Sequence, residues 1–164
     1  NDEANFDGKP FAGLFRKARS AGLHLTVHAG ESRIPTSSQS ILSALDDLGA
    51  ERLGHGVQIY RDPALMEAVA KRGVILELCP TSNILTKSIS APEAYPIRQI
   101  RAAGVRVCIN ADDPGVFDYD LNHEYRMLAQ LHGLAEADFA AMNRDALESS
   151  FIRDDLKRNY FTRG

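Results

Sequence analysis

Three short motifs contain the residue types that metal-assisted hydrolysis requires. VHAGE contains His28 and, three residues later, Glu31; an imidazole can bind a metal ion and a carboxylic acid can move protons. GHG places His55 between two glycines, which would let the backbone approach a ligand closely. NADDP contains the adjacent carboxylates Asp112 and Asp113. In a loop these two side chains could address different partners, such as a metal ion and a substrate.

Each motif alone also has a purely structural explanation. VHAGE could hold a histidine at the edge of the core and a glutamate at a helix start, GHG could be a strand-to-loop turn, and Asp-Pro is a common turn signal. The three motifs carry more weight together, because they follow three predicted strands and should meet at one edge of a sheet. His, Glu, His and Asp side chains that converge there are suited to metal-assisted hydrolysis.

Four short apolar segments, separated by helical patterns, would position these motifs. The predicted strands cover 23–28, 52–56, 73–79 and 104–110. Their continuous apolar character is typical of parallel strands covered on both faces. Between the strands, apolar residues recur at helical spacing, and Asp62-Pro63 is a typical helix start. Alternating strands and helices predict an α/β fold with a parallel sheet.

The candidate residues fall at the carboxyl ends of the predicted strands. His28, His55, Cys79 and Asn110 end the four strands at intervals typical of a βα unit. Both α/β barrels and open α/β sheets place their sites at this end. A complete (βα)8 barrel takes about 250 residues, so a chain of 164 residues is either half of a barrel or a small open sheet. A half barrel would have two unpaired strand edges.

Composition and other motifs exclude several alternatives. A net charge of −3 argues against strong attraction to nucleic acid, and no apolar run approaches the roughly 18 residues that span a bilayer. The start NDEANFDGKP is acidic and polar, so we expect it not to be a signal peptide. Cys79 and Cys108 lie in apolar segments and are expected to be buried thiols, which favours a cytoplasmic location. In CPTSN, Ser82 and Asn83 are expected to shape the pocket floor.

The searches for other catalytic signatures are negative. The sequence contains no Gly-rich phosphate loop and no GxSxG motif. The pairing of HxE with PCxxC is also absent, which excludes the fold of the cytidine-type zinc deaminases.

Taken in order, VHAGE, RLGHGV, ELCPTSN and NADDPGVF resemble the adenosine/adenine deaminase family of metal-dependent hydrolase barrels, with bacterial adenosine deaminases as the nearest members. The resemblance extends from NDEANF to SSFI and so covers nearly the whole chain. It implies that residues 1–164 are a single partial domain, the C-terminal half (about four βα units) of a TIM (βα)8 barrel.

The resemblance also implies a role for each site residue. His28 and Asp112 would be ligands of one zinc ion, which would lower the pKa of its water. Glu31 would protonate the purine N1, and His55 would orient the attacking water and help to deprotonate it. Asp113 would hydrogen-bond the purine N7. Water would add at C6 and ammonia would leave, so that adenosine or deoxyadenosine becomes inosine or its deoxy form in purine salvage.

Two departures from the family pattern limit what this chain can do alone. The family's HxH motif, which supplies two further zinc ligands, occurs nowhere in the sequence. A family glycine that contacts the purine either aligns with Asn1, in an alignment without gaps, or lies just upstream, which makes Asn1 a candidate substrate contact. We therefore expect the isolated chain to be inactive, and its partners to be a purine nucleoside and either the N-terminal half of the barrel or a second copy of the chain.

Three alternatives stay open at this point. Within the same class, the substrate could be adenine or a modified adenine nucleoside such as aminodeoxyfutalosine. From a different class, the chain could be a non-catalytic half barrel that binds a ligand or a partner chain.

Overall fold

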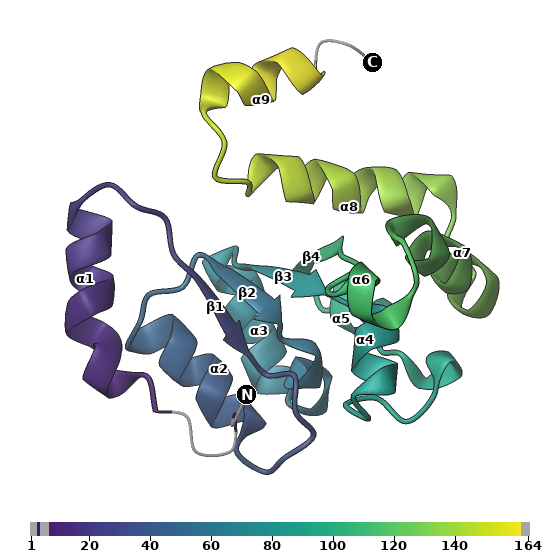
Figure 1. The fold of residues 1–164 in the computed structure, drawn as a ribbon, viewed down its shortest axis with the longest axis horizontal. Helices are drawn as coiled ribbons and strands as arrows, with labels where there is room; N and C mark the ends of the chain where they lie inside the picture. Colours follow the sequence, from purple (N-terminus) through teal and green to yellow (C-terminus); the bar gives the residue numbers. More distant parts are fainter. Residues whose placement is uncertain (1–2, 4–6, 162–164) are drawn as a thin grey trace.

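The computed structural model describes Glu3 and residues 7–161, and within them four parallel strands form one sheet (Figure 1). The strands are β1 (Thr26–Ala29), β2 (Arg52–His55), β3 (Ile75–Leu78) and β4 (Arg106–Ile109). Each is shorter than the segment predicted from the sequence. Their spatial order equals their order in the chain, and each pairs in parallel with the next. This is the predicted βα repeat.

Helices connect and flank the strands, and α3 begins where the sequence predicts. The α-helices are α1 (Ala12–Ser20), α2 (Ser37–Asp46), α3 (Pro63–Arg72), α4 (Pro80–Leu85), α5 (Ile97–Ala102), α6 (Pro114–Phe117), α7 (Leu121–His132), α8 (Glu136–Glu148) and α9 (Asp154–Phe161), with 3-10 turns at Lys9–Phe11, Val57–Arg61 and Pro92–Ala94. At the start of α3, the Asp62 carboxylate accepts a hydrogen bond from the Leu65 backbone N–H at 3.0 Å. The Asp-Pro helix start is therefore confirmed.

One face of the sheet packs against helices α2, α3 and α5 and forms the core. In β1, Val27 and Ala29 point to this face and are buried, whereas Thr26 and His28 point away and are exposed. The core also contains apolar residues of the other strands and of these helices: Leu53, Leu76, Leu78, Val107, Ile109, Ile41, Leu45, Leu65, Met66, Val69, Ile97 and Ile100. The expectation that both faces of every strand are covered is wrong for the described chain, because composition alone does not reveal which face meets a helix.

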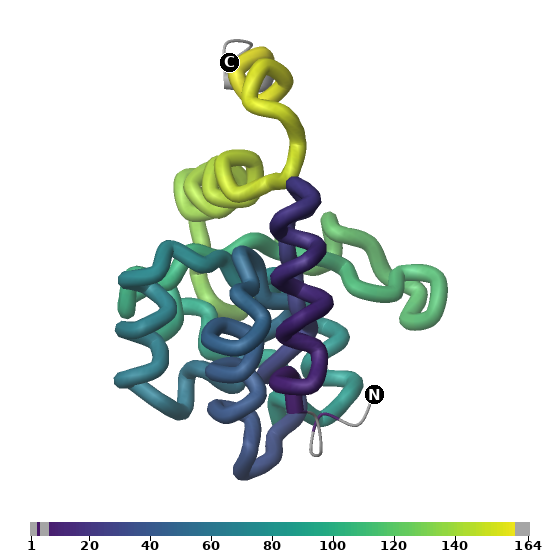
Figure 2. The backbone as a smooth tube through the Cα atoms, turned by 90° about the vertical axis from the view of Figure 1, so that its left-hand side faces the viewer, coloured from purple at the N-terminus to yellow at the C-terminus, as the bar shows by residue number. Residues whose placement is uncertain are grey.

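The edges of the sheet differ in what lies against them. On β4, the Arg106 guanidinium pairs with Asp145 at 2.8 Å and with Glu148 at 2.9 Å, so α8 is fixed beside this strand. By contrast, α1 has no buried residue, and Leu14 is 65% exposed. Figure 2 shows α9 beyond α8, away from the sheet.

No helix in the described part of the chain combines the length and the apolar character needed to cross a membrane.

Candidate active site

The predicted motifs meet in one pocket at the carboxyl ends of the strands. The pocket has a volume of about 520 Å³ and lies on the sheet face that the core helices leave open. It is lined by Thr26, His28, Gly54, His55, Glu77, Cys79, Asn110, Ala111, Asp112 and Pro114. The prediction that residues from separate strands converge at this edge is therefore confirmed.

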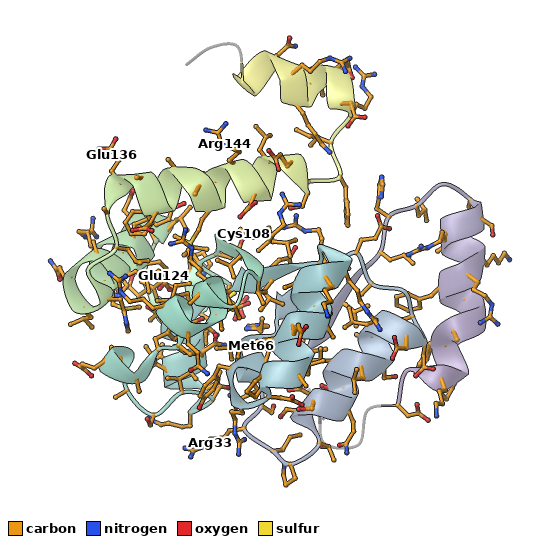
Figure 3. The ribbon with its side chains drawn as sticks, turned by 180° about the vertical axis from the view of Figure 1, so that it is seen from behind. Arg33, Met66, Cys108, Glu124, Glu136 and Arg144 are labelled. Atoms are coloured by element: carbon orange, nitrogen blue, oxygen red, sulfur yellow. The ribbon has the colours of Figure 1, made fainter. Side chains whose placement is uncertain are left out.

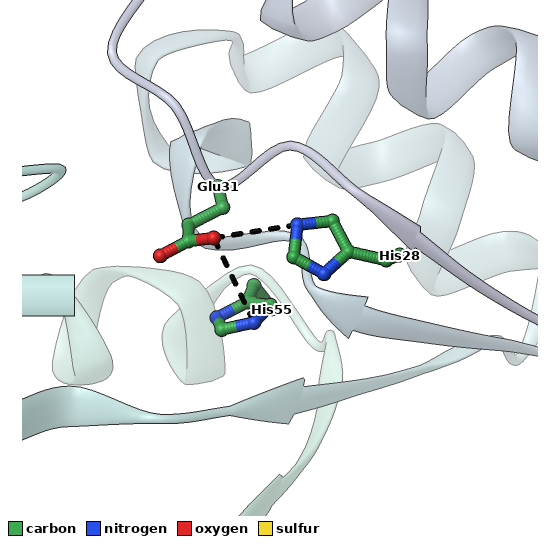
Figure 4. A group of neighbouring side chains, drawn as sticks. All are labelled: His28, Glu31 and His55. Carbon is green, nitrogen blue, oxygen red and sulfur yellow. Dashed lines mark ion pairs between the residues drawn. The ribbon is translucent and has the colours of Figure 1, made fainter. Parts of the chain in front are cut away.

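Glu31 bridges the two histidines of the site (Figure 4). Its Oε2 atom lies 3.3 Å from His28 Nε2 and 3.8 Å from His55 Nε2, and its Oε1 atom accepts a hydrogen bond from Thr86 Oγ1 at 2.9 Å. The imidazole rings of His28 and His55 are 4.6 Å apart between centroids. Three side chains from two strand ends and one loop thus share one small polar space.

These contacts set the protonation of the group. The hydrogen bond to His28 lowers the pKa of Glu31 to about 2, and the same bond raises the pKa of His28. Burial has the opposite effect on His55 and lowers its pKa. These shifts keep Glu31 a carboxylate, favour the protonated form of His28 and favour the neutral form of His55. A cation bound at His28 Nε2 would take the place of that proton.

Asp112 approaches the same group from the β4 side. Its Oδ2 atom lies 3.9 Å from His55 Nε2 and accepts a hydrogen bond from Ser82 Oγ at 2.6 Å. Candidate ligand atoms within 4.8 Å of one another form two groups in the described chain, His28–Glu31–His55 and His55–Cys79–Asp112. The two predicted zinc ligands, His28 and Asp112, thus belong to different groups that His55 joins.

This set of donors fits zinc chemically. Imidazole nitrogen and carboxylate oxygen are ordinary zinc ligands, and the ion usually takes four of them. His28 and Asp112 would hold the ion from this chain, and the remaining positions would be filled from outside it. Burial strongly raises the pKa of Cys79, which keeps this residue a neutral thiol, in agreement with the predicted packing role.

The backbone is held in an uncommon conformation at two of these residues. His55 has φ 61° and Asp112 has φ 53°, in the left-handed region that non-glycine residues seldom adopt. Such a conformation costs about 1–3 kcal/mol per residue and is typical of functional sites. Next to His55, Gly30 has φ 72°, and a Cβ atom there would meet the Ile41 side chain and come within 3.3 Å of Gly56 Cα. The two loops therefore pack backbone to backbone.

Glu3 holds the loop that carries Glu31, and the sequence analysis missed this role. Its carboxylate, which is 6% exposed, accepts hydrogen bonds from the backbone N–H groups of Gly30, Glu31 (3.2 Å) and Ser32 (2.6 Å) and from Ser40 Oγ (2.9 Å). Three successive amides that point at one carboxylate fix the path of the loop. The acidic residue within NDEANF was the available signal.

Residues of the CPTSN segment form hydrogen bonds to side chains of the site. Ser82 and Asn83 are buried and do not line the pocket; they bond to Asp112 and to His55 instead. The Thr81 backbone N–H donates to both carboxylate oxygens of Glu124 in α7, at 3.1 and 3.2 Å. Figure 3 labels Glu124, a further supporting residue that the sequence analysis missed.

Of the two predicted substrate contacts, only Asp113 lies among the described residues. Asp113 is exposed, precedes α6 as its N-cap residue and is not among the residues that line the pocket. Asn1 lies outside the described residues.

Comparisons with known proteins agree with this geometry. The family described as "Adenosine deaminase" matches residues 1–163. A relative named adenosine deaminase, from Shewanella loihica, is 41% identical over 157 residues, which cover 96% of this chain and 46% of the relative. The chain thus spans about half the length of the curated relatives that it matches.

Solved structures of similar proteins also match this chain over about half of their own length. An adenine deaminase from Arthrobacter aurescens superposes with a TM-score of 0.89 at 28% identity, over 97% of this chain and 48% of that one. An amidohydrolase from Burkholderia ambifaria with bound Zn gives 0.86 at 25% identity, over 98% and 44%. The N6-methyl-AMP deaminase from Arabidopsis gives 0.77 at 28% identity, over 90% and 42%.

The predicted fold, the C-terminal half of a (βα)8 barrel, is confirmed by these matches and by the four parallel strands. With a family match over residues 1–163 and the predicted motifs gathered in one pocket, the chain belongs to the adenosine deaminase family.

Proposed function

We propose that the complete protein containing this chain is a zinc-dependent hydrolase that converts adenosine and deoxyadenosine to their inosine forms and ammonia. The observation that carries the proposal is the position of Glu31, whose carboxylate lies within 3.8 Å of the Nε2 atoms of both His28 and His55 at the end of a parallel sheet. A proton-transfer group beside metal-binding side chains is what hydrolytic deamination requires. The names of the relatives favour adenosine as the substrate.

Each side chain has a defined task in this proposal. His28 and Asp112 would hold zinc, which supplies a water of lowered pKa, near about 7, as the nucleophile source. Glu31, which is a carboxylate in the described site, would take up the proton that the attacking water releases and pass it to the purine N1, which makes C6 more electrophilic. His55 would hold the attacking oxygen in place, and Asp113 would bind the purine N7. One water is consumed and one ammonia is released for each purine.

The partial site implies a partner within the barrel. Among the described residues, β1 and β4 each pair with a strand on one side only, and α1 has no buried residue. We propose that residues 1–164 are one partial domain that the N-terminal half of the barrel completes. A second copy of the chain, paired along the same edges, is the alternative that size-exclusion chromatography would distinguish. A purine nucleoside would be the small-molecule partner, and the cytoplasm the location.

The substrate can be assigned by measuring ammonia release from the purified full-length protein with zinc bound. The panel contains adenosine, deoxyadenosine, adenine, aminodeoxyfutalosine and N6-methyl-AMP, from which methylamine would be released instead. We expect the highest kcat/KM with adenosine. A clear preference for adenine would assign the protein to the adenine deaminases. A folded, zinc-loaded protein that releases no amine from any of these compounds would contradict the proposal and favour a non-catalytic binding role.

A further inference from the structure

His55 is the end of a short hydrogen-bonded chain that leads into the core. Asn83 Nδ2 lies 3.0 Å from His55 Nδ1, and the Tyr95 hydroxyl lies 3.1 Å from Asn83 Oδ1. Asn83 is fully buried, and Tyr95 and His55 are only 3% and 5% exposed. Bulk water therefore does not compete for these bonds.

Tyr95 determines which way the Asn83 amide points. Burial raises the pKa of Tyr95 well above its usual value, so the phenol keeps its proton and can donate it. Within the described residues, the only hydrogen bond of the Tyr95 hydroxyl is the one to Asn83 Oδ1. In the reversed amide, Nδ2 would donate to the Tyr95 oxygen, and the phenolic proton would then have no acceptor among the described residues. The network thus assigns Oδ1 to Tyr95 and Nδ2 to His55.

The consequence lies at the other nitrogen of the imidazole. A neutral imidazole has one N–H and one lone pair, so a ring that accepts a hydrogen bond at Nδ1 carries its proton at Nε2. His55 Nε2 faces the pocket, 3.8 Å from Glu31 Oε2 and 3.9 Å from Asp112 Oδ2. An N–H that points between two carboxylates is favourably placed.

We infer that Asn83 is a positioning residue which, anchored by Tyr95, fixes the Nε2–H tautomer of His55. On the proposed deaminase function, on which this inference rests, His55 then enters the reaction as a hydrogen-bond donor to the attacking oxygen. The Nε2–H group of His55 donates to a lone pair of the attacking oxygen. In the resting state, His55 does not take the proton of the water. This differs from the expectation, drawn from the family resemblance, that His55 helps to deprotonate the water.

The near-isosteric substitution Asn83→Asp reverses the polarity of the bond. An ionised carboxylate can only accept, so Nδ1 of His55 then carries a proton. ¹⁵N NMR of the full-length protein labelled at histidine reports this directly, with the His55 signals assigned by their loss in a His55→Gln variant. We expect a pyridine-type Nδ1 and a pyrrole-type Nε2 in the wild type, and a pyrrole-type Nδ1 in Asn83→Asp.

Kinetics of the same proteins provide the second measurement. We expect Asn83→Asp to lower kcat by about 10²–10³-fold, the range for loss of one positioned hydrogen-bond donor, with KM changed only a few-fold and zinc content unchanged. Ile84→Val, a conservative change at the next residue of α4, should leave both spectrum and kcat unaltered. If Asn83→Asp does not fold, Tyr95→Phe replaces it, with a mixture of His55 tautomers and a smaller loss of kcat expected.

The two proposals fail separately. A pyrrole-type Nδ1 in wild-type His55, or an Asn83→Asp variant that keeps wild-type kcat, would overturn the tautomer assignment while ammonia release from the wild type still supports the deaminase. A wild type that releases no ammonia but has the pyridine-type Nδ1 would instead contradict the deaminase and leave the assignment standing.

Discussion

Replacement of the buried Glu124 by glutamine should stabilise the protein near neutral pH. Glu124 is fully buried in α7, and burial raises its pKa from 4.5 to about 7, against the effect of its hydrogen bonds to Thr81. Both carboxylate oxygens accept from the Thr81 backbone N–H. A glutamine keeps one acceptor for this bond and has no charge to desolvate, so the geometry of α4 is preserved.

The magnitude follows from the two pKa values. Because the folded-state pKa lies above the unfolded value, the folded protein holds an extra proton between pH 4.5 and about 7. The free energy of unfolding therefore falls as pH rises through this interval and stays constant above it. At about 1.4 kcal/mol per pKa unit, the interval corresponds to at most ~3 kcal/mol. Glu124→Gln removes this loss.

Urea unfolding of the full-length protein at about pH 5 and about pH 8 measures the effect. We expect the free energy of unfolding of Glu124→Gln, relative to that of the wild type, to be higher at about pH 8 than at about pH 5, by up to ~3 kcal/mol. Glu136→Gln, at an exposed position in α8 (Figure 3), is the matched control and should show no such gain. A difference between wild type and Glu124→Gln that does not change with pH would refute the reasoning.

Two further predictions concern the metal and the partner. His28→Ala or Asp112→Ala in the full-length protein should lower zinc content, measured by metal analysis after dialysis, and chelation should abolish activity; full zinc occupancy in both variants would show that other residues bind the ion. The isolated 164-residue chain should be inactive, bind little zinc and associate along β1 and β4 in size-exclusion chromatography. A dilute monomer with deaminase activity would contradict the half-barrel account.

The features that sequence alone predicted are local or repeated. Asp62-Pro63 starts a helix because the cap and the proline act within one turn, and this holds in the structure. The placement of His28 and His55 followed from the βα repeat, since parallel strands bring their carboxyl ends to one edge.

The supporting residues could not be predicted in the same way. Glu3 is 27 residues from Gly30 in the sequence, and Glu124 is 43 residues from Thr81. Neither contact has a periodic or motif signal, because each depends on how distant segments pack. The exposed sheet face was missed for a related reason, since an apolar segment does not specify whether a helix covers one of its faces or both.

The most direct test of the central claim is the steady-state deamination of adenosine by the full-length protein and its Glu31→Gln variant, with zinc content measured on the same samples. Glutamine retains the size of Glu31 but cannot give or recover a proton. The account predicts that kcat falls by about 10²–10⁴-fold or more while zinc stays bound. Unchanged kinetics in Glu31→Gln would contradict it.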